Sequence, residues 1–305
     1  MIPGIYRDMD SATYFDDPCP EPSLSQSIAK VLIERSPLHA MHEHPRLRPA
    51  TPDDDEGEKY DKAKAIGNAA HAIMIGRGKT LEIVKFNDFK GGEAKKIRDA
   101  AYADGKTPIL EKHLNIASEI VASGLSQLKR HEDRDAFQNG SGEVALIWQD
   151  DGIWCRALVD WLHDDIRTVD DYKTSGMSMA PHVIGLRAET AGWHVQAAFI
   201  ERGLDILHPA TAGRRRYRFI GQEQDGKPYG LTSMHMDEHW LTMGRKKVQA
   251  AMTMWRAALK TGRWPGYPVQ AIRPEYPQFR EKQWLERELG GDFEPQNDTK
   301  LIMAG

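Results

Sequence analysis

Residues 153–173 read IWCRALVDWLHDDIRTVDDYK, and this stretch decides the fold. It contains two runs rich in β-branched and aromatic residues, Ile153–His163 and residues 166–173. Asp164 and Asp165 stand between the two runs and favour a tight turn. The stretch therefore predicts an antiparallel β-hairpin.

Two carboxylates share one face of this predicted hairpin. A turn centred between the runs pairs Asp160 with Val169 and Leu158 with Asp171. Opposed residues share a face of a sheet, and residues two apart keep it, so Asp160 and Asp171 point the same way. They are expected as diagonal neighbours, roughly 7–8 Å apart at the backbone. Lys173 lies two residues beyond Asp171 and joins them on that face.

The paired carboxylates predict a site for a divalent metal ion. Two carboxylates on neighbouring strands can reach one Mg²⁺, whose oxygen ligands lie at about 2.0–2.1 Å. Asp170 faces the other way in a strand, so Asp171 and not Asp170 is assigned to the site. The spacing D-x₁₀-D-x-K also arises by chance, and the alternative is a pair of solvated strand residues. The motifs around the hairpin favour the metal site.

A histidine on a predicted helix is the next candidate. Residues 58–77 carry apolar side chains at helical intervals and include the segment Gly67-Asn68-Ala69-Ala70-His71. The small residues of that segment would let the helix approach a sheet closely and hold His71 above the metal. A lone helical histidine is more often structural, but the downstream carboxylates favour a ligand or near-ligand.

Further along the chain, residues 181–202 are expected to form one amphipathic helix, with Gln196 beside its apolar stripe. The alternative is that Gln196 is an ordinary polar residue that flanks a buried face.

Together these segments resemble the PD-(D/E)XK nuclease superfamily. Val159-Asp160 and the run Asp171-Tyr172-Lys173-Thr174 match its catalytic strands, with Val where the variable Pro of the family stands. The segment from Gly67 to His71 matches the G-x-x-x-H element of the RecB-like and phage-exonuclease branches. Residues 192–199 resemble the helix whose Gln faces the site, although Ile200 stands where the family often has Tyr.

The N-terminal region narrows the resemblance. Residues 23–28, SLSQSI, followed by residues 36–39, SPLH, resemble the opening of exonuclease VIII (RecE-like) phage and prophage proteins. This resemblance implies an α/β restriction-endonuclease-like core, a central mixed sheet flanked by helices, and a helical N-terminal accessory region. It implies a single nuclease domain over residues 1–305, with a mainly helical part at 1–135, the catalytic core at 136–262 and a C-terminal tail at 263–305.

The resemblance also implies roles. Asp160, Asp171, the backbone carbonyl of Tyr172 and His71 would hold Mg²⁺, for which Mn²⁺ could substitute, while Lys173 would handle the attacking water and Gln196 would face the site. The expected activity is 5′→3′ degradation of linear double-stranded DNA, which leaves 3′ single strands for a single-strand annealing recombinase. A homo-oligomeric ring around DNA is expected. The alternatives are a structure-specific or restriction-type endonuclease and a noncatalytic DNA-binding recombination scaffold.

Composition sets wider bounds. The chain has 305 residues, of which 40% are hydrophobic, enough for a substantial core. No apolar stretch approaches the roughly 18 residues of a membrane span, and no charged-then-apolar leader follows Met1, so a cytoplasmic protein without a membrane span is expected. The two cysteines, Cys19 and Cys155, are too few and too far apart to predict a disulfide framework, a zinc knuckle or an iron–sulfur cluster.

Charge indicates where DNA could be held. The formal net charge of −4 excludes a uniformly basic surface. The run Arg214-Arg215-Arg216-Tyr217-Arg218 opens a predicted strand, and its alternation places Arg214, Arg216 and Arg218 on one face. We expect these three side chains to contact the phosphate backbone, although such charge runs are equally often solvated surfaces.

Overall fold

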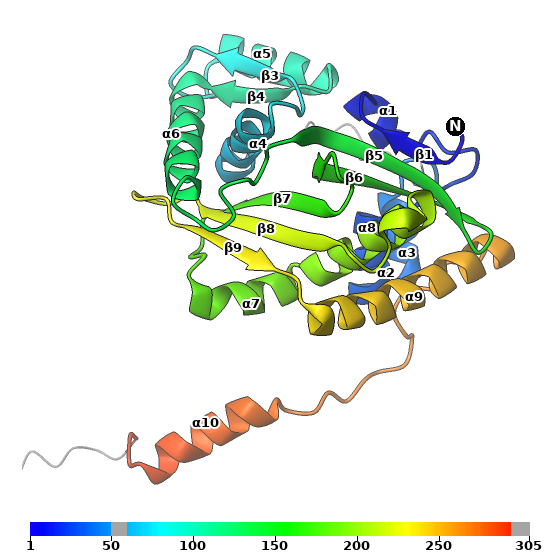
Figure 1. The fold of residues 1–305 in the computed structure, drawn as a ribbon. Coiled ribbons are helices and arrows are strands. Elements are labelled where there is room, and N and C mark those ends of the chain that lie inside the picture. The colour runs from blue at the N-terminus through cyan, green and yellow to red at the C-terminus, as the bar shows by residue number, and fades with distance from the viewer. Residues whose placement is uncertain (50–59, 294–305) are drawn as a thin grey trace, which may run out of the picture. The chain divides into compact units, whose positions relative to one another are not determined.

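A seven-stranded mixed sheet forms the centre of the fold (Figure 1), in a computed structural model that describes residues 1–49 and 60–293. Six strands follow the order β1-β5-β6-β7-β8-β9, and β2 pairs with β6. The pairs β7/β8 and β2/β6 are parallel and the others are antiparallel. The strands are β1 (Gly4–Tyr6), β2 (Leu24–Ser25), β5 (Gly140–Asp150), β6 (Ile153–His163), β7 (Thr168–Ser175), β8 (Arg216–Glu223) and β9 (Leu231–His235).

Helices cover both faces of this sheet, so the predicted central mixed sheet flanked by helices is confirmed. On one face α2 (Gln26–Glu34), α8 (Trp193–Leu207) and α9 (Glu238–Thr261) bury a core with side chains of β5, β6 and β8. On the other face α4 (Lys62–Ile75) and α6 (Glu111–Leu128) bury a second core with Tyr172 and Ile220. The neighbouring residue Phe219 belongs to the first core, as the alternation of a strand requires.

Shorter elements complete this part of the chain. A small parallel sheet pairs β3 with β4 beside α5. The remaining elements are α1 (Ser11–Phe15), α3 (Pro37–Glu43), β3 (Leu81–Val84), α5 (Gly92–Ala103), β4 (Thr107–Leu110), α7 (Pro181–Thr190) and the 3₁₀ turn η2 (Pro209–Thr211). The first residues of the predicted helix 58–77 lie outside the described residues.

Local chemistry sets the bounds of the helices next to the site. Helix α4 begins where the Asp61 carboxylate accepts the backbone N–H of Lys64 at 3.0 Å, and it ends at Gly76, whose φ is 73°. The sequence predicts one helix over residues 181–202, and this prediction is wrong. Gly192 adopts φ 69° and separates α7 from α8, because a left-handed residue cannot continue a helix.

The β6–β7 hairpin differs from its predicted register by two residues. Trp161 pairs with Asp170, and Leu162 pairs with Val169. The connection is longer than expected because the Asp165 carboxylate accepts backbone N–H groups at the end of the turn, so that β7 begins at Thr168. The observed register places Asp160 directly opposite Asp171 rather than diagonal to it. A shift of two residues keeps both side chains on one face.

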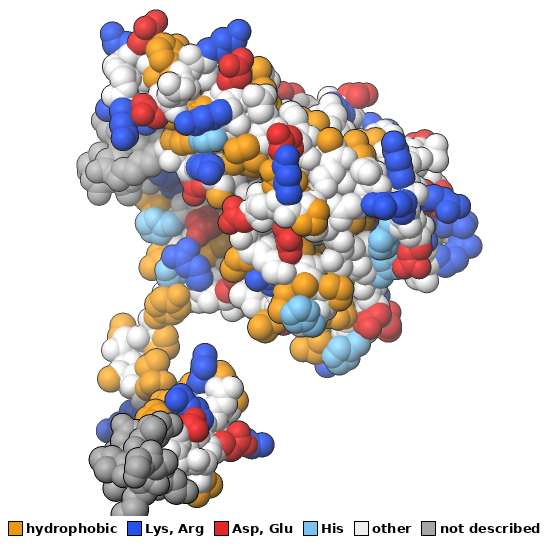
Figure 2. Space-filling view, turned by 90° about the vertical axis from the view of Figure 1, so that its left-hand side faces the viewer, with side chains coloured by type: hydrophobic (Ala, Val, Ile, Leu, Met, Phe, Trp, Pro, Cys, Tyr) orange, Lys and Arg blue, Asp and Glu red, His pale blue; other side chains and the backbone are white. Residues whose placement is uncertain are grey.

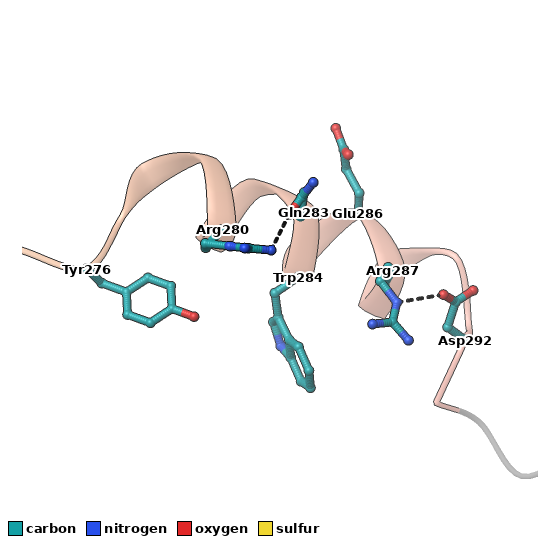
Figure 3. A pocket seen from close by; sticks show the side chains of 7 residues that line it. All are labelled: Tyr276, Arg280, Gln283, Trp284, Glu286, Arg287 and Asp292. Carbon is teal, nitrogen blue, oxygen red and sulfur yellow. Dashed lines mark hydrogen bonds and ion pairs between the residues drawn. The ribbon is translucent and has the colours of Figure 1, made fainter. Parts of the chain in front are cut away.

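The chain divides into two compact units, residues 1–266 and 267–305. The second contains α10 (Gln278–Leu289), in a region where the sequence suggested only a tail; residues 294–305 lie outside the described part. Helix α10 buries none of its side chains. Figure 3 shows Tyr276 and Trp284 projecting to one side of it, and the Trp284 ring stacks on Phe293 with centroids 4.6 Å apart. Among the described helices, none is long and apolar enough to cross a membrane.

Candidate active site

The candidate site lies where β6 and β7 separate. Their hydrogen-bonded ladder ends at the pair Trp161–Asp170, one residue from Asp160 and Asp171. Beyond this point β7 stays paired with β8 as far as Ser175, while β6 pairs with β2 instead. The gap between the strands lets groups from both faces of the sheet reach the two carboxylates. Helix α4 approaches from one face and α8 from the other.

Asp160 is held by a strand and a helix. Its Oδ2 accepts the backbone N–H of Tyr172 at 3.0 Å and lies 3.4 Å from Nε2 of His71 on α4. Helix α4 comes this close because Gly67 lacks a side chain. A Cβ at Gly67 would lie 3.0 Å from Oγ1 of Thr174 on β7, which is tighter than ordinary packing permits. The small residues of the G-x-x-x-H segment therefore bring His71 to the acid pair, as the sequence predicts.

Asp171 is fully buried and receives groups from three directions. Its Oδ2 accepts hydrogen bonds from Nε2 of Gln196 at 2.5 Å and from the hydroxyl of Tyr217 at 3.3 Å. Lys173 Nζ lies 2.5 Å from the buried Oδ1 as an ion pair, and no other donor in the described part of the chain reaches this oxygen. Gln196 therefore faces the site on α8, where the sequence placed it.

The pKa values of the two acids move in opposite directions. Burial and the neighbouring Asp160 charge raise the pKa of Asp171 to about 6. For Asp160 burial acts in the same direction, but the charges of His71 and Lys173 outweigh it and lower the pKa below its usual value. Two carboxylates that share a buried site cannot both ionise easily. A cation placed between them would relieve this repulsion.

The neighbouring carboxylates raise the pKa values of both basic groups. Burial opposes the charge on Lys173, yet Asp171 and Asp160 together raise its pKa above the ordinary value. His71 behaves in the same way, because the charges of Asp160 and Glu143 outweigh burial and raise its pKa. At neutral pH the Lys173 ammonium is therefore a fixed positive charge beside the acids.

Sequence reasoning missed two residues of the site, Glu143 and Tyr217. Glu143 lies on β5 between the pairs Gly142–Trp161 and Val144–Val159, and so stands next to Asp160 in register. Its φ of 48° interrupts the regular alternation of β5. No sequence signal marks this interruption. Alternation along residues 214–218 places Tyr217 on the face opposite Arg216 and Arg218, but only the pairing of β8 with β7 brings it to the face of Asp171.

A divalent metal ion fits this donor set. Two carboxylates, Asp160 and Asp171, lie together in a buried site with one ammonium, that of Lys173, beside them, and their oxygens with a nearby imidazole suit Mg²⁺ or Mn²⁺. The three groups are not drawn tightly together: each acid instead turns toward donors of its own, Asp160 toward Tyr172 N–H and Asp171 toward Gln196.

Another acidic group lies closer together but is already satisfied. Among the described residues, Glu132, Asp133 and His235 have ligand atoms within 4.8 Å of one another. Asp133 Oδ2 accepts hydrogen bonds from Ser233 and His235, both at 2.7 Å, and its Oδ1 accepts one from Arg218 at 3.0 Å. Because protein donors occupy both oxygens of Asp133, hydrogen bonds within the protein are sufficient to account for this group.

The prediction that Arg218 contacts phosphate is wrong. Arg218 is fully buried, and its guanidinium binds Asp170, Asp133 and Asp135. Arg216 and Arg218 do share one face of β8, as alternation predicts, but other parts of the protein cover this face at Arg218. Arg216 is half-exposed, and the Arg214 guanidinium donates to the carbonyl of Ala210 at the surface. Figure 2 shows lysine and arginine side chains interspersed with acidic ones on the face in view, without a continuous basic stripe.

Comparison with known proteins gives a fold but no family. No family model matches the chain, and no curated protein matches its sequence. Fourteen chains of solved structures match. A crystal structure named "Putative exonuclease", from Eubacterium rectale, aligns with a TM-score of 0.57 and 12% identity over 90% of this chain and 98% of that chain. A phage-related exonuclease from Haemophilus somnus aligns with a TM-score of 0.36 and 12% identity over 79% and 96%. The chain therefore shares the fold of the Eubacterium rectale protein over nearly the whole of both.

Proposed function

We propose that this chain is a metal-dependent DNA exonuclease that hydrolyses phosphodiester bonds. The observation that carries the proposal is the convergence of Asp160, Asp171 and Lys173 with His71 and Gln196, from two strands and two helices, at the split in the sheet. The burial of Asp171 beside the Asp160 charge supports a metal-binding role, because a cation would relieve the repulsion between the two carboxylates. The shared fold with a protein named as an exonuclease is consistent with it.

In the proposed site Asp160, Asp171, the Tyr172 carbonyl and His71 would hold the ion. The chemistry that the ion would supply there is a lower pKa for a bound water and polarisation of the phosphoryl oxygen. The Lys173 ammonium, fixed beside Asp171, stabilises negative charge that develops on the phosphate. Gln196 positions the Asp171 carboxylate by donating to its Oδ2.

The finer assignment rests on the resemblance to exonuclease VIII. We propose that the substrate is linear double-stranded DNA, that degradation runs from the 5′ end, and that the remaining 3′ strand serves an annealing recombinase. A homo-oligomeric ring around DNA belongs to the same proposal. Arg214 and Arg216, which lie at the start of β8 with surface-accessible side chains, are its phosphate contacts outside the metal site.

The decisive experiment uses linear duplex DNA labelled at the 5′ or the 3′ end, incubated with Mg²⁺, with Mn²⁺ or with EDTA. Release of the 5′ label first, only with metal, is the expected result. Closed circular DNA serves as the matched substrate without ends and should survive. Cutting of the circle would replace the exonuclease with an endonuclease of the same fold. Binding of DNA without hydrolysis under every metal condition would replace it with a noncatalytic scaffold.

A further inference from the structure

An apolar groove opens beside the candidate site, on the side of α7. It has a volume of about 540 Å³ and is lined by Met177, Val183, Leu186 and Trp193. Met177 is 62% exposed and Leu186 is 75% exposed, although both are large apolar side chains. Exposed apolar side chains gathered around one hollow indicate a binding site more often than single ones do. The groove is therefore a candidate for an apolar part of a ligand.

The groove borders the candidate active site. Its wall includes Lys173, Thr174 and Ser175, at the end of β7. The same three residues line a second hollow of about 420 Å³, which His71 and Gly67 of α4 also line. The end of β7, with Lys173, therefore lies between the hollow beside His71 and the apolar groove beside α7. A ligand whose charged group lies at Lys173 can place its next apolar group in the groove.

An arginine without a partner supplies positive charge in this groove. Arg187 lines the groove, and its Nε is buried without a hydrogen-bond acceptor. Within the described part of the chain Arg187 forms no ion pair and no side-chain hydrogen bond, whereas Arg202 and Arg215 on the same side of the sheet each bind a carboxylate. The Arg187 guanidinium therefore has no carboxylate beside it, and a phosphate held in the groove would supply the missing anion.

We propose that this groove is a nucleobase subsite, which holds the base of a nucleotide next to the cleaved phosphodiester while Arg187 binds the adjoining phosphate. This inference rests on the proposed nuclease function and names a part of the substrate that the acids do not touch. A nucleotide has the required composition, because its flat apolar base is attached to an anionic phosphate. Contact with apolar side chains does not depend on the identity of the base, so the subsite accepts any sequence.

The test is a double-mutant cycle that combines variants of the groove with DNA substrates that each lack one base. Four linear duplexes each carry a single abasic residue, at the first, second, third or fourth position from the labelled end. Leu186→Ala and Met177→Ala should each lower kcat/KM on intact DNA by roughly 5- to 100-fold, the scale of losing one base contact. At one abasic position kcat/KM of the wild type should fall by a similar factor. The variants should show no further fall at that position, because they already lack the contact between groove and base.

The control is Leu125→Ala, which removes an exposed leucine from α6 on the other face of the sheet. This variant should leave kcat/KM unchanged on both intact and abasic DNA. Arg187→Gln should weaken binding of intact and abasic DNA alike and lower its salt dependence by about one phosphate contact, whereas Arg187→Lys should retain part of the affinity. Salt dependence separates a phosphate contact from a packing role.

Repeating the cycle as equilibrium binding of labelled DNA in EDTA separates this inference from the proposed function. If the wild type hydrolyses no substrate but the coupling between base and groove appears in binding, the nucleobase subsite stands and the nuclease proposal falls. If hydrolysis is normal and the losses from variant and abasic residue multiply at all four positions, the subsite is overturned. Groove variants with unchanged hydrolysis and unchanged DNA binding would overturn it too, and would leave the groove to a protein ligand.

Discussion

Asp170 and Asp171 are neighbours in the chain and are both fully buried, yet they lie on opposite faces of β7 in environments of opposite kind. Asp170 accepts hydrogen bonds on both oxygens, from Arg218, from His163 and from the backbone N–H of Phe137. Asp171 instead has the charge of a second carboxylate, Asp160, beside it, while Lys173 Nζ lies 2.5 Å from its Oδ1. Asp170 has all the hydrogen-bond partners that a buried charge needs.

This difference separates a structural ion cluster from a candidate catalytic one. The structural cluster extends from Asp170 through Arg218 to Asp133, and the Arg218 guanidinium lies between these two carboxylates. In the candidate catalytic cluster, burial and the charge of Asp160 raise the pKa of Asp171 to about 6, although Lys173 lies 2.5 Å away. Buried groups whose pKa values are shifted in this way are typical of sites that bind or react. Each prediction below tests this comparison.

The largest expected effect is on activity. Asp171→Asn should lower metal-dependent hydrolysis by at least about 10³-fold, the scale of removing one group from a catalytic unit. The melting temperature in EDTA should stay the same or rise, because the neutral amide removes the repulsion with Asp160. Lys173→Ala should lower hydrolysis similarly but leave Mg²⁺ affinity in calorimetry intact, since it removes no ligand. Normal turnover by Asp171→Asn would erase the distinction between the two aspartates.

The second prediction reverses the roles. Arg218→Met should lower the free energy of unfolding by about 3–5 kcal/mol, because it leaves Asp170 and Asp133 buried without their cation. Urea unfolding measures this loss. Arg216→Met is the matched control on the same face, and its half-exposed side chain predicts a change within about 0.5 kcal/mol. A similarly small change for Arg218→Met, with weaker DNA binding, would return Arg218 to the DNA contacts.

The third prediction compares two histidines. His71→Ala should lower hydrolysis in Mg²⁺ by about 10- to 100-fold, the effect of losing a group that supports a metal ligand. Mn²⁺ should restore part of the activity if the imidazole coordinates the ion. His235→Ala removes a histidine that bonds Asp133 in the structural cluster, and it should leave activity per folded molecule unchanged. Equal losses from both variants would mean that His71 acts through packing.

The shared face of the hairpin residues could be predicted because it depends on local periodicity alone. The register of the hairpin was wrong by two residues, but alternation has a period of two, so Asp160, Asp171 and Lys173 still share a face. Helical periodicity predicted helices at His71 and Gln196, and the family resemblance assigned both side chains to the acids, beside which they lie. The metal-binding role assigned to these residues stays a prediction.

The missed features depend on contacts between distant parts of the chain. Alternation shows that Arg216 and Arg218 share a face, but Asp133 and Asp135, more than eighty residues earlier, decide that this face is buried at Arg218. Glu143 comes next to Asp160 through a local interruption of β5. The strand β2 has only two residues and exists because it pairs with β6. None of these contacts leaves a periodic pattern in the sequence.

The smallest expected effect is a pH dependence of stability that arises in the structural cluster. Burial opposes the charge on Asp133, but hydrogen bonds from Ser233, His235 and Arg218 outweigh it and lower its pKa to about 2. An aspartate in the unfolded chain titrates near 3.9, so the unfolded state binds the proton first as the pH falls. The stabilisation is therefore complete above about pH 4 and is lost as the pH falls toward 2, by up to about 2 kcal/mol. Urea unfolding in EDTA between pH 5 and pH 2.5 measures this loss, and Asp133→Asn should show a shallower slope over the same interval. Equal slopes for the two proteins would mean that Asp133 is not the paired carboxylate that holds this cluster together.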